Sequence, residues 1–325
     1  MVQSADCQDL YRVAFWNVEN LFDTENDTVK NDDDFTPRGQ YRWSHRRYWT
    51  KLRHVYQTIV AMSVEPEVYL EPPAIIGLAE IENDKVLNDL CRGTQLRRLG
   101  YKYIHYESPD LRGIDNALLY RNDRFRPFFS QAISVSDSSK GFFTRDILLV
   151  EGVTNNDDTI ILLVNHFPSK RNNHADRLRM AQAMKLRQIM DSLQAAHKTA
   201  AVIAMGDFNA APDEPEIAIG LMKDSQYINM MSCIEPGRGT YKYQDLWTCL
   251  DQIIVSRNIT EPNGICPLQT ATPCGQIFDK DFLLLEDDKY MGYKVFRTFL
   301  GIRYLGGYSD HLPVYIDLRN RYKKE

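Results

Sequence analysis

One stretch of the sequence decides the predicted fold: Ala201-Val-Ile-Ala-Met-Gly-Asp207-Phe-Asn209. Its first five residues are apolar and its end is polar, which is typical of a short buried β-strand. We therefore predict a strand over 201–206, with Asp207 and Asn209 where that strand ends.

Other apolar runs predict further strands, and apolar residues at helical spacing predict helices between them. The strands are expected at 13–17, 74–80, 101–106, 116–120, 147–153, 159–165, 250–256 and 314–318, and the helices at 49–62, at about 175–197 and briefly after Pro215. This order is neither strict strand–helix alternation nor all-β. It predicts an α/β fold in which two mixed β-sheets pack face to face with helices on both outer faces, a four-layer α/β sandwich.

The domain organisation follows from the length. The chain has 325 residues and shows no obvious linker, so we expect a single domain over 1–325. Residues 257–308 are the least regular part. We expect them to form an irregular insertion on the substrate side of the domain.

The charge balance limits the class of partner. The chain has 39 basic and 44 acidic residues and a formal net charge of -5. Proteins that coat nucleic acid neutralise many phosphates with Lys and Arg, so this composition argues against such a protein. It leaves room for an enzyme that meets phosphates through a local basic group, for which the candidates are Lys170, Arg171, Arg177 and Arg179.

The sequence gives weaker information on location and assembly. The longest apolar runs, 160–164 and 200–205, are far shorter than the roughly 18 residues that span a bilayer. We expect no transmembrane segment and a monomer. No signal peptide is visible, and the compartment stays open, with a slight lean to a secreted or periplasmic protein if the N-terminus is trimmed.

The six cysteines are scattered without a C-x-x-C pair, which argues against a zinc ribbon or a thioredoxin-like site. If the compartment is oxidising, Cys266 and Cys274 are the pair that we expect to form a disulfide.

The chemistry is concentrated where apolar strands stop. The polar residues at these positions are Asn17, Glu80, His166, Asp207, Asn209, Asp251, Asp310 and His311. A single Asp or His at a strand end is usually a turn former, but this many residues of one chemical kind indicate a site. Carboxylates and amides without Cys suit a hard cation such as Mg²⁺ or Mn²⁺.

These residues stand in motifs that resemble those of the endonuclease/exonuclease/phosphatase superfamily. The motifs occur in the same order: Trp16-Asn17-Val18-Glu19-Asn20, Leu78-Ala-Glu80-Ile, Asn165-His166-Phe-Pro-Ser169, Met205-Gly-Asp207-Phe-Asn209, Leu250-Asp251-Gln-Ile and Tyr308-Ser-Asp310-His311-Leu-Pro. The resemblance runs from about residue 11 to residue 318. G-D-F-N and S-D-H-x-P are fairly specific, whereas N-x-E-N alone is weak.

The resemblance implies a role for each matched residue. Glu80 is expected to be the main metal ligand, helped by Asn17 and Asp310, with Mg or Mn as the cofactor. Asp207 is expected to orient or deprotonate the attacking water, and Asn209 to hold a phosphate oxygen. His311 is expected to contact the scissile phosphate, with Asp251 fixing its ring.

Some further residues are carried over in the same way. His166 stands where deoxyribonucleases and sphingomyelinases also have His, and Asp115 is expected to support it. Arg145 resembles a phosphate-contacting arginine of the deoxyribonucleases, although an exposed charge at a strand start is an equal alternative. Arg112 and Lys170 complete the expected substrate-binding residues.

The resemblance predicts a metal-dependent hydrolase of phosphate esters that works by in-line attack of water. A phosphodiesterase of nuclease type is favoured, and nucleic acid is then expected to bind weakly. A phosphomonoesterase or a sphingomyelinase-like enzyme is the alternative, because the fold does not decide between them. A catalytically silent binding domain is disfavoured, since such a domain has no reason to keep every polar strand end.

Overall fold

The predicted strand at residue 201 is present as β8 (Ala201–Asp207), and both of its faces are buried. The computed structural model describes residues 10–64, 71–136, 143–170 and 175–321. In β8, Ala201, Ile203 and Met205 belong to one hydrophobic core, whereas Val202 and Ala204 belong to a second. Because side chains alternate along a strand, β8 lies between two other layers of the molecule.

The strands form two large sheets. The first has the order β13 (Leu268–Thr270), β19 (Val314–Asn320), β1 (Tyr11–Leu21), β2 (Ile75–Ile81), β4 (Asp115–Arg121) and β3 (Tyr101–His105), and β14 (Gln276–Ile277) also pairs with β19. The second has the order β5 (Phe125–Ile133), β6 (Ile147–Thr154), β7 (Thr159–His166), β8, β12 (Asp251–Ser256) and β9 (Tyr227–Asn229). Each sheet contains one parallel pair, β1 with β2 and β7 with β8, among antiparallel pairs. Both sheets are therefore mixed, as predicted.

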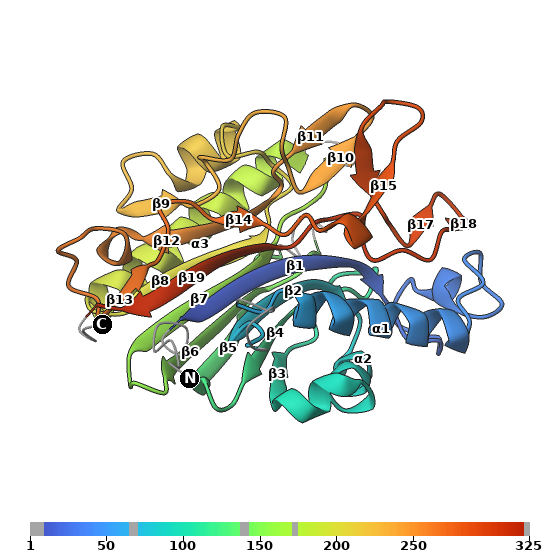
Figure 1. Cartoon of the computed structure of the whole chain (residues 1–325), viewed down its shortest axis with the longest axis horizontal. Coiled ribbons are helices and arrows are strands. Elements are labelled where there is room, and N and C mark those ends of the chain that lie inside the picture. The colour runs from blue at the N-terminus through green and yellow to red at the C-terminus, as the bar shows by residue number, and fades with distance from the viewer. Residues whose placement is uncertain (1–9, 65–70, 137–142, 171–174, 322–325) are drawn as a thin grey trace, which may run out of the picture.

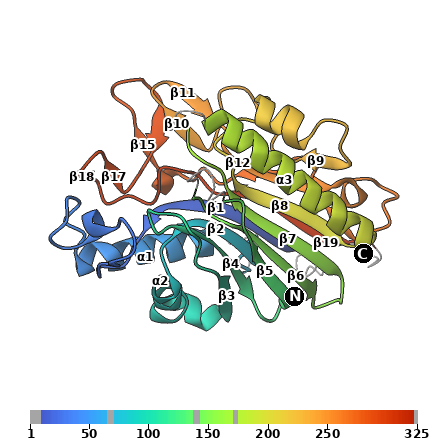
Figure 2. The ribbon, with the colours of Figure 1, turned by 180° about the vertical axis from the view of Figure 1, so that it is seen from behind.

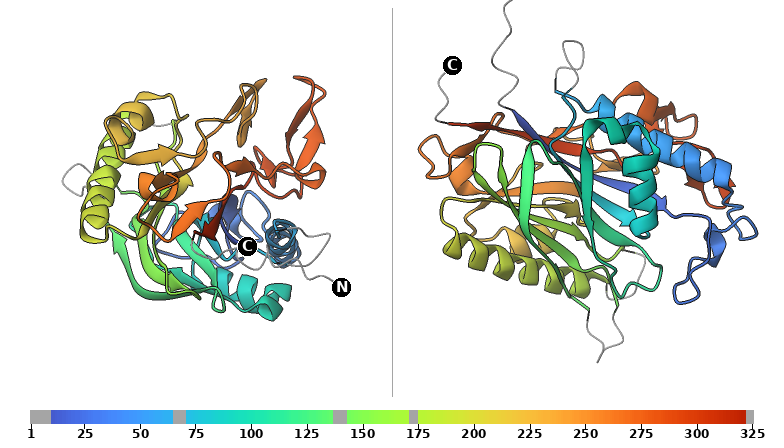
Figure 3. Two further views of the ribbon diagram at one scale, coloured as in Figure 1. Left: turned by 60° about the vertical axis from the view of Figure 1, so that its left-hand side comes forward. Right: turned by 90° about the horizontal axis from the view of Figure 1, so that it is seen from below.

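The sheets pack face to face, and the two long helices cover their outer faces. Gly77 lies at the contact between the sheets, where an added Cβ would be 3.1 Å from the Met205 sulfur. Helix α1 (His45–Ala61) buries Leu52, Val55 and Ile59, and α3 (Ala175–Ala196) buries a similar stripe under the second sheet. Figures 1 to 3 show the two helices on opposite sides of the sheets. The predicted four-layer sandwich is confirmed.

The remaining elements are short. They are η2 (Asp33–Phe35), α2 (Asp84–Asn88), η3 (Asp89–Gly93), η4 (Gln95–Leu99), η6 (Glu216–Leu221), η7 (Arg257–Ile259) and η8 (Asp281–Leu283). Three small hairpins are β10 (Tyr241–Tyr243) with β11 (Leu246–Thr248), β15 (Leu284–Glu286) with β16 (Tyr293–Val295), and β17 (Phe299–Leu300) with β18 (Arg303–Tyr304). In Figures 1 and 2 these hairpins lie together at one end of the molecule.

Residues 257–308 fall into two parts: β13 and β14 extend the first sheet, and the later residues form separate hairpins. One expectation needs correction. The predicted Cys266–Cys274 disulfide is wrong, since Cys274 is bonded to Cys233 and Cys266 is a buried free thiol. Proximity in sequence misled here, because the loop after β9 approaches the segment before β14 only in the folded chain: the Gly275 N–H donates to the carbonyl of Met230.

Candidate active site

The polar strand ends of the two sheets meet at one edge. Asn17 on β1 donates a hydrogen bond from Nδ2 to Oδ2 of Asp207 on β8, at 3.0 Å. Glu80 on β2 lies 4.0 Å from His166 on β7, measured between Oε1 and Nε2. Asp310 and His311 lie shortly before β19, which begins at Val314. The strands thus bring the predicted residues of both sheets together.

The backbone at this edge is unusual. Glu19, Asn20, Glu80 and Asn209 all have positive φ angles, between 47° and 65°. Such conformations cost free energy in residues other than glycine, and they concentrate at functional sites.

Gly206 is required by a close approach of the backbone. A Cβ at this position would lie 2.3 Å from the carbonyl oxygen of Asn165. The glycine therefore lets β7 and β8 bring His166 and Asp207 side by side, in the register that the parallel pair shows.

Asp207 is buried at the centre of the site. In addition to the Asn17 amide, the backbone N–H of Asn209 donates to Asp207 Oδ1 at 2.9 Å. Burial raises the pKa of Asp207 to about 7; His311 opposes this shift and Asp251 adds to it. A carboxylate with a pKa near neutrality is suited to accept a proton at neutral pH.

His311 forms a hydrogen bond with Asp251, as predicted, with Nδ1 2.7 Å from Asp251 Oδ2. Burial alone would lower the pKa of His311, but Asp251 and Asp207 outweigh burial and hold this pKa well above its ordinary value. The ring is therefore protonated at neutral pH. Its Nε2 lies 3.8 Å from Asp207 Oδ2, so it can donate a hydrogen bond to an anion that binds beside Asp207.

His166 differs from the prediction, because Asp115 does not support it. Burial lowers the pKa of His166 well below its ordinary value, and Arg145 and Arg112 lower it further. Its Nδ1 has no hydrogen-bond partner in the described part of the chain. His166 is thus a neutral ring, with Nε2 3.6 Å from Asp207 Oδ2.

The Asp115 carboxylate belongs to another histidine. It lies 3.2 Å from His105 Nε2 and accepts the backbone N–H of Ser108. In the β3–β4 pair, His105 stands opposite Ala117, so Asp115 is its diagonal neighbour on the same face of the sheet. Cross-strand pairing, which the sequence spacing does not reveal, decides this contact.

The predicted metal ligands Glu80 and Asp310 each use one carboxylate oxygen in hydrogen bonds with the described residues. Glu80 Oε2 accepts the N–H of Asn20 at 2.7 Å, whereas Oε1 has no hydrogen bond among the described residues and its nearest cationic neighbour is Arg112, at 3.9 Å. Asp310 likewise uses one oxygen, Oδ2, to bind Arg297 at 2.7 Å. Oxygen atoms of this kind are the preferred ligands of Mg²⁺ and Mn²⁺.

Two other predicted residues have partners within the protein. Asn17 uses its Oδ1 to accept the backbone N–H of Glu19, so its amide is committed to positioning groups of the site. Asn209 donates from Nδ2 to the carbonyl of Phe167 at 2.9 Å, and this bond fixes the position of its side chain.

The predicted substrate-binding residues have different surroundings. Arg145 is buried, not exposed: it donates to Asp110 Oδ2 at 3.1 Å and to the Phe167 carbonyl at 2.8 Å. Arg112 is half exposed and donates to Asn20 Oδ1 at 2.7 Å. Both arginines are close enough to His166 to affect its pKa.

In the predicted basic group after His166, two residues are paired with acidic side chains, and Arg177 is exposed. Lys170 is paired with Glu214, with Nζ 2.7 Å from Oε2. Arg179 is buried and paired with Glu216 at 2.8 Å. The anions come from residues 214–216, which lie beside α3 only in the folded chain; Arg171 is outside the described residues.

Three buried or half-buried residues near the site were not singled out from the sequence. Glu19 accepts the backbone N–H groups of Thr298 and Phe299, at 2.6 and 3.2 Å. Lys51 on α1 donates to Thr298 Oγ1 at 2.6 Å and to the carbonyl of Tyr308. Arg297 binds Asp310. Glu19 is part of the N-x-E-N motif, which was the available signal, but its partners are about 280 residues away.

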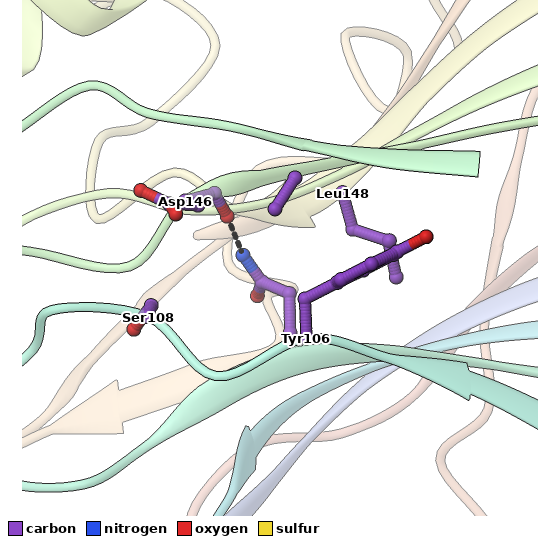
Figure 4. Close-up of a pocket in the computed structure, with 6 residues that line it drawn as sticks. Tyr106, Ser108, Asp146 and Leu148 are labelled. Carbon is purple, nitrogen blue, oxygen red and sulfur yellow. Dashed lines mark hydrogen bonds between the residues drawn. The ribbon is translucent and has the colours of Figure 1, made fainter.

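A small pocket lies apart from these residues. It has a volume of about 10 Å³ and is lined by Tyr106, Ser108, Asn116, Ala132, Asp146 and Leu148. Figure 4 shows this pocket, with Tyr106, Ser108, Asp146 and Leu148 labelled. The Asn116 side chain donates from Nδ2 to the carbonyl of Asp146 at 2.8 Å. This space is about the size of one water molecule, so it is too small for a substrate.

Comparison with known proteins bears on the family and the fold. Residues 12–320 match the model of the endonuclease/exonuclease/phosphatase family. No curated protein matches the sequence. No helix in the described ranges is both long and apolar enough to cross a membrane.

Several solved structures are similar in fold. They include a humanized D. rerio TDP2 (TM-score 0.60, 15% identity, covering 96% of this chain and 99% of that one) and the human Nocturnin catalytic domain with bound sulfate anion (TM-score 0.58, 17% identity, 96% and 94%). Another is a mannosyl-6-phosphatase of Bacteroides thetaiotaomicron (TM-score 0.54, 15% identity, 95% and 99%). At these identities the likeness concerns the fold alone. Together with the match over nearly the whole sequence, it confirms the resemblance: the chain belongs to the endonuclease/exonuclease/phosphatase family, whose superfamily consists of phosphoesterases.

Proposed function

We propose that the protein is a Mg²⁺- or Mn²⁺-dependent phosphodiesterase of the nuclease type, which attacks its substrate in line with water. The observation that carries this proposal is the position of the buried Asp207, whose Oδ2 lies 3.8 Å from Nε2 of the protonated His311 and 3.6 Å from Nε2 of the neutral His166. Burial raises the pKa of Asp207 to about 7. A proton acceptor beside a cationic donor is the arrangement that hydrolysis of an anionic ester needs.

Asp207 is the proposed acceptor of the proton from the attacking water. The Asn17 amide and the Asn209 N–H hold its two oxygens in place. A general base acts best when its pKa is near the working pH, because it is then both deprotonated and sufficiently basic. The burial that raises this pKa thus favours the role.

His311 is the proposed donor to a phosphate oxygen. Asp251 receives the Nδ1 hydrogen, which keeps the ring charged and turns Nε2 toward Asp207. The backbone N–H of Asp251 is itself bound to Thr240 Oγ1. A fixed, charged donor stabilises the additional negative charge of the transition state.

Glu80 and Asp310 are proposed to hold the cation through the oxygens that have no hydrogen bond in the described part of the chain. When bound, such an ion would polarise a phosphoryl oxygen and stabilise the leaving oxygen. Arg112 and Arg145 are proposed to bind the substrate phosphates around this centre. Lys170 is a weaker candidate, since Glu214 neutralises it.

A phosphomonoesterase is the second candidate function. It is favoured by the neutralisation of Lys170 and Arg179, because an extended nucleic acid needs a longer cationic surface than a small phosphate does. The similarity in fold to a mannosyl-6-phosphatase is compatible with it.

The two candidates can be separated by the rates on bis(p-nitrophenyl) phosphate and p-nitrophenyl phosphate, measured with Mg²⁺ and with Mn²⁺. The proposal predicts faster hydrolysis of the diester and a loss of about a hundredfold or more in Asp207→Asn, with the exposed Asp245→Asn as the matched control. Preference for the monoester would favour the second candidate, and activity on neither substrate would contradict both.

The disulfide bears on the compartment. Disulfides persist mainly in oxidising environments, and Cys233 is bonded to Cys274. We therefore propose a secreted or periplasmic location. Detection of both cysteines as free thiols in protein isolated from its native cells would contradict it.

A further inference from the structure

Arg297 lies at the edge of the active site, although it comes from the hairpin region between β16 and β17. Its Nη2 donates to Asp310 Oδ2 at 2.7 Å, and Asp310 is the neighbour of His311 in the chain. Tyr241, which lies beside the same guanidinium, packs its ring on that of His311 with 5.0 Å between centroids. Arg297 thus contacts two direct neighbours of the proposed phosphate donor.

The guanidinium is only partly used by the protein. Its Nε is buried and has no hydrogen-bond partner in the described residues, the nearest carboxylate oxygen being Glu19 Oε1 at 3.8 Å. The side chain as a whole keeps 28% of its surface exposed. Because Nε is buried, an anion on the exposed side would bind the terminal N–H groups that the bond from Nη2 to Asp310 does not use.

The backbone that carries Arg297 is fixed to the sheets. Glu19 accepts the N–H groups of Thr298 and Phe299, and Lys51 donates to the Thr298 hydroxyl. The backbone N–H of Gly307 also returns to the carbonyl of Arg297 at 3.2 Å. The arginine is therefore held in position before any ligand binds, which lowers the entropy cost of binding.

We propose that Arg297 is a substrate-binding residue that donates to a phosphate oxygen beside His311. A guanidinium carries five N–H donors, and the ion pair of Arg297 with Asp310 uses one nitrogen, Nη2, so further donors can serve a phosphate oxygen. The inference rests on the proposed function, because it takes the substrate to be a phosphate ester bound next to Asp207 and His311. The ordinary alternative is that Arg297 only fastens the hairpin region to Asp310.

The test is the binding of inorganic phosphate in the presence of Mg²⁺, measured by calorimetry. Arg297→Ala should weaken the affinity about tenfold or more, because hydrogen bonds to charged groups contribute about 1.5–3 kcal/mol. Arg297→Lys should keep part of the affinity, since the positive charge remains while the planar set of guanidinium N–H donors is lost. The matched control is Arg303→Ala, an exposed arginine of the neighbouring β18, which should bind phosphate as the wild type does.

Two further readouts make the outcome unambiguous. If the role is in binding, Arg297→Ala should raise KM for the phosphate ester more than it lowers kcat. Unchanged phosphate affinity in Arg297→Ala, or a wild type that does not bind phosphate, would overturn the inference. A wild type that binds phosphate through Arg297 but hydrolyses no ester would contradict the proposed function and leave the inference standing.

Discussion

Two buried histidines face the carboxylate of Asp207, and only one of them is charged. His311 has Asp251 at 2.7 Å and is protonated, whereas His166 has two arginines nearby and no partner for Nδ1, and is neutral. Burial favours the neutral form of both rings, so the neighbouring charges make the difference. The site therefore combines one cationic donor with one uncharged ring around Asp207.

Asp251→Asn should shift the pH dependence of activity. Asp251 is the largest of the contributions that raise the pKa of His311, so its loss should lower that pKa. If His311 must be protonated to act, activity is present below its pKa and is lost as the pH rises above that pKa. The alkaline limb of kcat/KM should therefore move to lower pH, with Asp123→Asn, a surface residue, as the control. An alkaline limb that stays in place would contradict the charged state of His311.

The sequence predicted the His311–Asp251 pair but not the partner of Asp115. The first followed from the family resemblance, which implies that Asp251 fixes the ring of His311. The partner of Asp115 depends on which strand pairs with β4. That strand is β3, and its His105 lies beside the Asp115 carboxylate. Likewise, Arg297 could not be found from a motif, since it acts through a contact with Asp310 across an irregular region.

At the scale of elements, α1 connects the scaffold to the hairpin region. Lys51 is buried on the inner face of this helix, and its Nζ bonds Thr298 and Tyr308. Burial lowers the pKa of Lys51 to about 8, although Glu19 and Asp310 act in the opposite direction. One cation thus holds residues that lie on both sides of β17 and β18.

Lys51→Met should destabilise the protein by about 3 kcal/mol, because two buried hydrogen bonds from a charged group are lost and their acceptors are left without a donor. Urea unfolding measures this difference. Lys102→Met, at an exposed position of β3, is the control and should change stability by less than about 0.5 kcal/mol. Equal stability of the two variants would show that Lys51 does not fasten the hairpin region.

The strands differ in how well the sequence reveals them. β7 and β8 bury both faces and are continuous apolar runs, so they were predicted to within one residue. β5 was missed because it contains Pro127 and exposes Phe128 and Phe129, as an edge strand can. The hairpin strands after residue 283 have only two or three residues, too few for a periodic pattern.

For the whole molecule, the distribution of charge matters more than the net charge of -5. Lys170 and Arg179 are paired with Glu214 and Glu216, and Arg145 is paired with Asp110, whereas Arg177 and Arg112 are the more exposed basic residues. The described residues thus offer only a few exposed cations near the site. Such a surface suits a short phosphate segment better than a long duplex.

Binding of DNA should accordingly be weak and only moderately dependent on salt. Each phosphate neutralised contributes about 0.9 to the slope of log affinity against log salt, so about three arginine contacts predict a slope no steeper than about -3. Fluorescence anisotropy with a labelled oligonucleotide, over a range of salt concentrations, gives this slope. Nanomolar binding with a much steeper slope would show that the protein has an extended cationic surface.

The most direct test of metal-dependent ester hydrolysis at this site combines chelation with a change at Glu80. Protein stripped of metal is assayed on bis(p-nitrophenyl) phosphate while Mg²⁺ or Mn²⁺ is restored, and direct binding of Mn²⁺ is measured alongside. We expect no activity in excess chelator, recovery with the metal, and in Glu80→Gln a loss of about a hundredfold together with weaker Mn²⁺ binding. The exposed Glu235→Gln should behave as the wild type. Full activity in excess chelator, or wild-type rates and Mn²⁺ affinity in Glu80→Gln, would contradict a metal centre at Glu80.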